Sequence, residues 1–300
     1  MFSFTKEQKI FEISGVKIGG QPGNLPTVLF GGFFFKGEPY FDTAKQQIKD
    51  MYILSNKTGN PVIPDFFIKK EENLEKIIEF IIKEIPKNKP FSVDIIEPDL
   101  KIKTLEILSN KNLLKRTVYN SIHIGTTNEE RQTLKKHIPE MAIVVAFNPK
   151  DKSPDGKIEV LENSAHLLDK GLLDIVKEVG VKKILIDTAA LAPGNYSGAA
   201  IAAIPVIKEE YGYPTGCAIH NVVEKSSWLK NFEDSRGIVD VASNINIPVF
   251  GGDFAIFGPV ERANQVFPIV AWEDILISEY TENYFGITPD NFHPRRKFFE

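Results

Sequence analysis

The segment NPVIPDFFIKKEENLEKIIEFIIKEIPKNKPFSVDII, at residues 60–96, contains two short apolar runs separated by a longer amphipathic one. The runs at 60–68 and 90–96 are typical of strands buried in a parallel sheet. Between them, apolar residues recur at helical spacing beside Glu and Lys, which predicts a helix over 71–84. Two prolines then separate this helix from the second strand. The segment therefore predicts a strand–helix–strand unit with parallel strands.

The same order of segments recurs from residue 26 to about residue 280. Strands are predicted at 27–35, 60–68, 90–96, 116–122, 141–147, 182–189, 214–220 and 247–252. Helices are predicted at about 42–57, 71–84, 98–109, 127–137, 167–179, 197–211, 225–242 and 258–280. Eight strands, each followed by a helix, predict an α/β fold of the (β/α)8 TIM-barrel type. The alternative is an open doubly wound sheet, which more often shows about five or six repeats and a glycine fingerprint after its first strand.

Several glycines surround the first predicted barrel strand, in VKIGGQPGNLPTVLFGGFFF at residues 16–35. A phosphate-binding loop would place its glycines after a strand and before a helix, whereas the first glycines here precede the apolar run, so a phosphate loop is disfavoured. Just upstream, FEISGVKI predicts a β-hairpin with a Ser-Gly turn that covers one end of the barrel. We expect a hairpin extension at 1–25, a barrel domain at 26–285 and a tail at 286–300.

Composition and charge exclude several classes of function. Of the 300 residues, 42% are hydrophobic and 25% are charged, as in a globular protein with a large core. The formal net charge is −4 and no Lys/Arg block is long enough to follow a nucleic-acid backbone, so nucleic acid is not expected as a partner. The single cysteine, Cys217, excludes an internal disulfide and a multi-thiolate metal site, and indicates a reducing cytoplasm. We expect neither a signal peptide nor a membrane span.

Polar side chains close nearly every predicted strand. They are Asp65, Asp94, Asn120, Asn148, Asp187, His220, Asn221 and Asp253. Any single one could simply cap the following helix, but in a barrel the carboxyl ends of the strands form the active site. Lys and Arg are nearly absent from these positions, which disfavours an anionic ligand. Asp and Asn suit a neutral heterocycle rich in N–H donors, such as a reduced pterin, whose aminopyrimidinone edge could pair with Asp187 or Asp94.

A combination of further motifs resembles one known family. The motifs are KIGGQPGNLPTVLFGGFFF at 17–35, TGNP at 58–61, VYNSI at 118–122, IVVAFNPKDKSPDGK at 143–157, GCAIHNV at 216–222 and DFAIFGPVERANQVFPIVA at 253–271. Together they resemble the H subunit of tetrahydromethanopterin S-methyltransferase and its relatives that use tetrahydrofolate. The resemblance implies a pterin-binding barrel that moves a methyl group between N5 of a tetrahydropterin and the cobalt of a corrinoid protein. It also implies that GGQPG is a turn leading into the first strand.

By the same resemblance, Asp94, Asn120, Asp187 and Asn221 hold the pterin, and Asn148 is expected to join them. Methyl loss from a tertiary amine requires more positive charge at N5. Our hypothesis is that Asn221, through water with Asp94 or Asn120, supplies a hydrogen bond to N5, while Asp187 anchors the pyrimidinone. Asn148 begins a long segment after the fifth strand, which we expect to act as a lid.

The resemblance also sets expectations for partners. Cobalt would come from cobalamin on a separate corrinoid protein, so the chain would need no metal ligands of its own. A cytoplasmic homodimer is expected, with peripheral association to a membrane methyltransferase complex through a partner.

Two alternatives to this methyltransferase stay open. One is a pterin enzyme of the dihydropteroate synthase type, which would need a basic pocket for diphosphate. The other is a noncatalytic scaffold subunit that binds pterin or corrinoid. Two strand residues are given structural interpretations: His220 as a core histidine whose ring is satisfied by a partner, and Cys217 as an inert core thiol.

Overall fold

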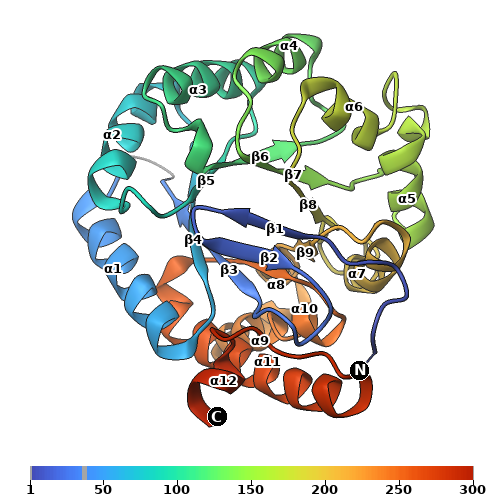
Figure 1. Cartoon of the computed structure of the whole chain (residues 1–300). Coiled ribbons are helices and arrows are strands. Elements are labelled where there is room, and N and C mark those ends of the chain that lie inside the picture. Colours follow the sequence, from blue (N-terminus) through green and yellow to red (C-terminus); the bar gives the residue numbers. More distant parts are fainter. Residues whose placement is uncertain (1, 36–38, 300) are drawn as a thin grey trace.

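Eight parallel strands form a closed barrel in the computed structural model of this chain, which describes residues 2–35 and 39–299. Their order around the barrel is β10-β3-β4-β5-β6-β7-β8-β9 (Figure 1). The strands are β3 (Val28–Phe34), β4 (Val62–Phe67), β5 (Phe91–Asp94), β6 (Thr117–Ile122), β7 (Met141–Val145), β8 (Ile184–Asp187), β9 (Thr215–Cys217) and β10 (Phe254–Phe257). The predicted TIM barrel is confirmed. The outermost residues of the predicted hairpin extension and tail, Met1 and Glu300, lie outside the described residues.

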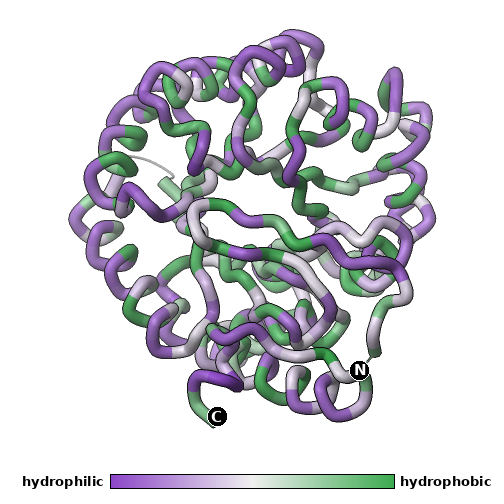
Figure 2. The backbone as a smooth tube through the Cα atoms, in the orientation of Figure 1, coloured by the Kyte–Doolittle hydropathy of each residue, from purple (hydrophilic) through white to green (hydrophobic). Residues whose placement is uncertain are grey.

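Helices surround the barrel (Figure 1). They are α1 (Phe41–Thr58), α2 (Leu74–Glu84), α3 (Pro98–Asn110), α4 (Asn128–Lys136), α5 (Pro154–Glu162), α6 (Leu172–Val179), α7 (Ser197–Tyr211), α8 (His220–Glu224), α9 (Glu233–Ser243), α10 (Asn246–Val249), α11 (Ala263–Phe285) and α12 (Pro294–Phe299). Hydrophilic and hydrophobic residues alternate along them (Figure 2), as expected for helices with one face on the core. Within the described ranges, no helix has the length and apolar character needed to cross a membrane.

The eighth barrel strand lies later in the chain than predicted. The predicted strand at 247–252 is instead the end of α10 followed by a turn at Gly251, whose φ is +80°. Both IPVF at 247–250 and FAIF in β10 are short apolar runs, and such runs do not distinguish a helical turn from a strand. Phe254 at the start of β10 pairs with β3 and with β9, and this pairing closes the barrel.

Asp253 therefore lies at the amino end of β10, and its predicted place at the mouth of the barrel is wrong. Its carboxylate accepts hydrogen bonds from Lys208 Nζ (2.5 Å) and from the Thr215 backbone N–H (2.8 Å). Lys208 also donates to the Gly20 carbonyl oxygen at 2.9 Å. This buried ion pair joins α7, β9 and the segment before β3, so it serves the fold at the end opposite the predicted site.

An antiparallel hairpin covers the amino-terminal end of the barrel. Strands β1 (Ile10–Ile13) and β2 (Val16–Gly19) pair with each other and lie across the barrel opening (Figure 1). The buried side chains of Ile13 and Ile18 belong to the same apolar cluster as Val28 and Phe30 in the barrel interior. The predicted hairpin is confirmed, and it closes the end of the barrel away from the carboxyl ends of the strands.

Candidate functional site

Three carboxyl groups and one carboxamide face the barrel interior near the carboxyl ends of the strands. Asp65, Asn120 and Asp187 each lie two residues beyond a side chain that fills the interior, and these side chains are Ile63, Val118 and Leu185. Because side chains alternate between the two faces of a strand, residues two apart share a face. Asp94 ends β5 and is the register partner of Asn120 in β6, so these two side chains share that face as well.

Burial and mutual repulsion raise the pKa values of these carboxyl groups. Desolvation raises the pKa of Asp65 to about 6. Ser92 and Asn120 lower this pKa, but by less than desolvation raises it. Desolvation raises the pKa of Asp94 well above its ordinary value, and the neighbouring Asp65 raises it further. Asp187 also raises the pKa of Asp94, although it lies on β8. The mouth therefore holds carboxyl groups that influence one another's ionisation, and burial together with Asp65 and Asp187 favours the neutral form of Asp94.

Asp187 lies at the end of β8 with its carboxylate held by its own loop. One oxygen accepts a hydrogen bond from the backbone N–H of Ala189 at 2.7 Å. Desolvation raises the pKa of Asp187 to about 6, and this hydrogen bond and the ammonium of Lys157 act in the opposite direction. The group is thus mostly ionised at neutral pH and oriented for accepting further hydrogen bonds.

A buried lysine lies behind Asp94 on the helix that follows β5. Lys101 Nζ donates to the Ser121 carbonyl oxygen (2.7 Å) and pairs with Glu130 at 3.3 Å. Its charge lowers the pKa of Asp94, although less than burial and Asp65 raise it. The predicted scarcity of cations holds for the strand ends but not for the adjoining helices, because Lys101 on α3 and Lys157 on α5 are both buried near the carboxyl groups.

Asn148 organises the segment after β7, which contains α5 and is therefore more ordered than the predicted long loop. The Asn148 amide donates to the Gly156 carbonyl oxygen at 3.0 Å. Its oxygen accepts from the backbone N–H groups of Lys150 (2.9 Å) and Asp151 (3.1 Å). The Ser153 hydroxyl caps α5 by accepting from Gly156 N. The polar atoms of Asn148 are thus engaged within its own segment, and they fix α5 against the mouth of the barrel.

Asn221 lies in the first turn of α8, because β9 ends at Cys217 and is shorter than predicted. Its side chain is half-buried and makes no hydrogen bond within the described part of the chain. Cys217 is fully buried, and burial raises the pKa of its thiol, as expected for an inert core cysteine.

His220 does not have the full set of partners that we predicted. Its ring is buried and packs edge-on against Phe34, with 5.8 Å between ring centroids. Its Nδ1 is buried without a hydrogen-bond partner among the described residues. Burial lowers the pKa of His220 to about 4, so the imidazole is neutral at physiological pH.

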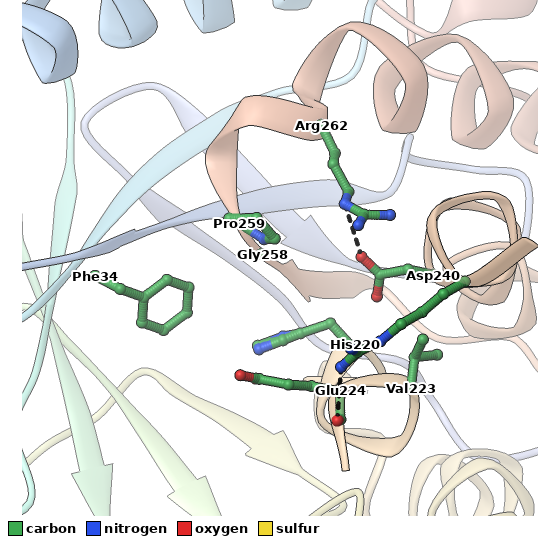
Figure 3. Close-up of a pocket in the computed structure, with 9 residues that line it drawn as sticks. Phe34, His220, Val223, Glu224, Asp240, Gly258, Pro259 and Arg262 are labelled. Atoms are coloured by element: carbon green, nitrogen blue, oxygen red, sulfur yellow. Dashed lines mark hydrogen bonds and ion pairs between the residues drawn. The ribbon is translucent and has the colours of Figure 1, made fainter. Parts of the chain in front are cut away.

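A cavity of about 300 Å³ opens beside His220 and is bounded by the ends of β3 and β10 and by α8 and α9 (Figure 3). His220 and Glu224 extend toward Phe34 in this view, and Arg262 Nε pairs with Asp240 at 3.3 Å on the opposite wall. The cavity lies on the same end of the barrel as Asn221 and the carboxyl groups. Its walls carry both signs of charge, so it is not the basic pocket that a diphosphate requires.

Comparison with known proteins identifies the family. The sequence model of the family described as tetrahydromethanopterin S-methyltransferase MtrH subunit matches residues 6–289. The H subunit of tetrahydromethanopterin S-methyltransferase from Methanothermobacter thermautotrophicus is 36% identical to this chain and aligns over 98% of each chain. The chain belongs to this family. The same-named subunit from Methanocaldococcus jannaschii is 33% identical over 99% of each chain, and the H subunit of the putative methyltransferase mtx from Methanosarcina barkeri is 36% identical over 98% of each. The predicted family and enzyme class, a methyltransferase, are confirmed.

The barrel of this member of the MtrH family also resembles solved dihydropteroate synthases. The enzyme from Thermus thermophilus superimposes with a TM-score of 0.54 at 13% identity, over 88% of this chain and 99% of that chain. The enzyme from Coxiella burnetii, solved with pteroic acid, gives a TM-score of 0.58 at 12% identity over 88% and 98%. Identities this low establish a shared fold alone, and they do not favour the dihydropteroate synthase alternative over the methyltransferase.

Proposed function

We propose that this chain transfers a methyl group between N5 of a tetrahydropterin and the cobalt of a corrinoid protein. The observation that carries the proposal is the convergence of Asp65, Asp94 and Asp187 on one end of the barrel, beside Asn120. Pterin methyl transfer is the chemistry of the family to which the chain belongs. An acceptor-rich mouth suits the N–H donors of a pterin head better than it suits an anion.

Asp187 is the proposed anchor of the pterin head. The aminopyrimidinone ring places a ring N–H next to an amino group, and an ionised carboxylate can accept from both at once. Asp187 meets this requirement because its carboxylate is buried, mostly ionised and held in place by the Ala189 N–H. Asn120, which can both donate and accept, is the proposed second contact, and Asn148 supports the site through the α5 segment.

Asp94 is the proposed proton donor to N5, with Asn221 as a second hydrogen-bond donor. The bond between N5 and the methyl carbon breaks with its electron pair staying on N5, while the electron pair of cobalt(I) forms the new bond to the methyl group. The proton required at N5 comes from Asp94, which favours its neutral form because of burial and the nearby Asp65. In the reverse direction Asp94 takes this proton back.

The proposal includes the partners that the family resemblance implies. The corrinoid is cobalamin carried by a separate protein, which supplies cobalt(I) as a substrate. The methyl carrier is tetrahydromethanopterin, with tetrahydrofolate as the alternative. We also propose a cytoplasmic homodimer that meets a membrane methyltransferase complex only through a partner.

Calorimetric titration with methyl-tetrahydromethanopterin and, separately, methyl-tetrahydrofolate tests the proposal. We expect one of them to bind the wild-type chain, and the Asp187→Ala variant to lose that binding. Asp174→Asn, which changes an exposed carboxylate on α6, is the matched control and should bind normally. Binding of a pterin without transfer to cobalt(I) on the cognate corrinoid protein would favour the scaffold subunit instead. Unchanged affinity in Asp187→Ala would contradict the assigned anchor.

A further inference from the structure

Among the residues that the structure describes, three lysine side chains are almost completely buried, and one of them differs from the others. Lys101, Lys157 and Lys208 are each at most 1% exposed. Lys101 pairs with Glu130, and Lys208 pairs with Asp253. Within the described residues, the side chain of Lys157 forms neither a hydrogen bond nor an ion pair. A buried ammonium without a partner is costly, so this position requires an explanation beyond packing.

The backbone around Lys157 is fixed to the mouth of the barrel. Lys157 lies in the first turn of α5, directly after Gly156, whose carbonyl oxygen is held by Asn148 at 3.0 Å. Asn148 follows β7 by three residues, and Val145 at the end of β7 is the register partner of Asp187. Ala146 N donates to the Asp187 carbonyl oxygen at 2.8 Å. The lysine is therefore carried by a segment that is attached to the strand pair ending in Asp187.

The tip of the Lys157 side chain reaches the neighbourhood of Asp187 but stops short of it. Burial lowers the pKa of Lys157, and Asp187 is the group that most strongly opposes this effect. The Lys157 ammonium in turn lowers the pKa of Asp187. No ion pair joins the two groups. The Nζ atom of Lys157 is not completely buried, so the small exposed surface of this side chain includes its tip. Lys157 Nζ thus keeps a small accessible surface near an acceptor, the Asp187 carboxylate, with which it forms no ion pair.

We propose that Lys157 Nζ donates a hydrogen bond to the ring carbonyl oxygen of the pterin head while Asp187 accepts from the adjacent ring N–H. In an aminopyrimidinone the carbonyl oxygen and this N–H are neighbours on one edge, so a donor beside an acceptor is the complementary arrangement. Lys157 is then a residue that selects 4-oxo over 4-amino pteridines. This inference rests on the proposed function, because it assumes that Asp187 holds the pterin head.

The test compares two head-group probes, 6-methylpterin and 2,4-diamino-6-methylpteridine. The second probe carries an amino group in place of the 4-oxo group and also lacks the adjacent ring N–H. The wild-type chain should prefer the 4-oxo probe. Lys157→Met should weaken binding of that probe by about tenfold to a hundredfold, the range for a lost hydrogen bond to a charged group, and should leave the 4-amino probe nearly unaffected. The preference of the wild-type chain for the 4-oxo probe should therefore shrink by the same factor in the variant, while the part of the preference that comes from the ring N–H and Asp187 remains.

Melting temperatures separate this role from a structural one. Lys208→Met is the matched control, because it also removes a fully buried lysine but leaves Asp253 unpaired at the far end of the barrel. We expect Lys208→Met to lower the melting temperature and to keep the probe preference. Lys157→Met should keep or raise the melting temperature, since it removes an unpaired charge. If Lys157→Met does not fold, Lys157→Gln serves in its place, because it retains a donor and should show an intermediate preference.

Two results would overturn the inference, and a third would contradict the proposed function on which it rests. An unchanged probe preference in Lys157→Met, or in Lys157→Gln where only that variant folds, would exclude contact with the ring carbonyl. A fall in melting temperature as large as that of Lys208→Met would assign Lys157 to the fold. Failure of the wild-type chain to bind either probe at saturating concentration would instead contradict the proposed function itself.

Discussion

Asp94 on β5 and Asn120 on β6 are register partners, so a carboxyl group that favours its neutral form lies beside a carboxamide at the mouth of the barrel. Asp65 raises the pKa of Asp94 from the other side, on β4. This arrangement differs from a simple ring of carboxylates, because it supplies a proton donor as well as acceptors. A methyl transfer that must protonate N5 needs both.

Replacement of Asp94 should separate catalysis from binding. Asp94→Asn keeps the size of the side chain but removes the acidic proton, so we expect the rate of methyl transfer to fall by about 10² to 10⁴-fold, the usual range for a lost general acid. The dissociation constant of the pterin should change only a few-fold, as measured by calorimetry. An equal loss of binding and rate would instead place Asp94 among the pterin anchors.

The pH dependence of methyl transfer to cobalt should follow the neutral form of Asp94. Because the pKa of Asp94 is raised, the proton is retained above the ordinary range of a carboxyl group and is lost as the pH rises through the raised value. The single-turnover rate should therefore decline on the alkaline side, and Asp94→Asn should abolish that decline. A wild-type rate that increases with pH over the same range would contradict the assigned acid.

Pterin affinity should have the opposite pH dependence, because the anchor must be ionised. The pKa of Asp187 is raised to about 6, so the carboxylate is lost as the pH falls below that value. Affinity measured by calorimetry should weaken by about tenfold for each pH unit below this value, as expected when one proton competes with binding. Asp187→Asn should bind weakly at every pH, and affinity of the wild-type chain that is constant from pH 7 to pH 5 would exclude this anchor.

The same carboxylate should reduce the stability of the ligand-free protein. Its pKa is higher in the folded than in the unfolded chain, so its contribution is most favourable below the unfolded pKa and is lost as the pH rises through about 6. At pH 7, Asp187→Asn should be more stable than the wild-type chain by up to about 3 kcal/mol. Chemical denaturation should show this difference shrinking toward pH 4, whereas a difference independent of pH would refute the assignment.

A polar network at the amino-terminal end of the barrel should affect stability without affecting binding. Asp274 on α11 accepts from the Thr27 backbone N–H (2.9 Å) and from Asn60 Nδ2 (2.6 Å). Asn60→Ala should lower the free energy of unfolding by about 1–3 kcal/mol because it leaves buried Asp274 with fewer donors. Asn264→Ala, on the exposed face of α11, is the matched control. A change in pterin affinity for Asn60→Ala would show that the two ends of the barrel are linked.

Most of the fold could be predicted from the sequence because seven of the eight barrel strands carry long or strongly apolar runs beside clear helices. The eighth could not, because IPVF and FAIF lie close together and are both short apolar runs, and it is the pairing of Phe254 with β3 and β9 that places the strand at FAIF. The wrong position predicted for Asp253 is a direct consequence. Pairing between distant strands is a tertiary property, which local patterns do not contain.

The carboxyl groups at the mouth of the barrel could be predicted because strand ends can be read from the sequence. The burial of the lysines near them could not be predicted. Lys157 occupies the apolar face of α5, with Val160 and Leu161 three and four residues later and fully buried. That spacing is the one available sequence signal, but a lysine at such a position usually extends its charge to the surface. The role of Asn148 within its segment also depends on contacts that only the folded chain provides.

Single-turnover methyl transfer to cobalt tests the central claim most directly. The protein would be mixed with methyl-tetrahydromethanopterin and with its cognate corrinoid protein reduced to cobalt(I), while the visible spectrum is followed. We expect methyl-cobalt to form with the wild-type chain and to form about 10² to 10⁴-fold more slowly with Asp94→Asn. Equal rates for the two proteins, or formation of methyl-cobalt at the uncatalysed rate with a wild-type chain that binds the pterin, would contradict the account.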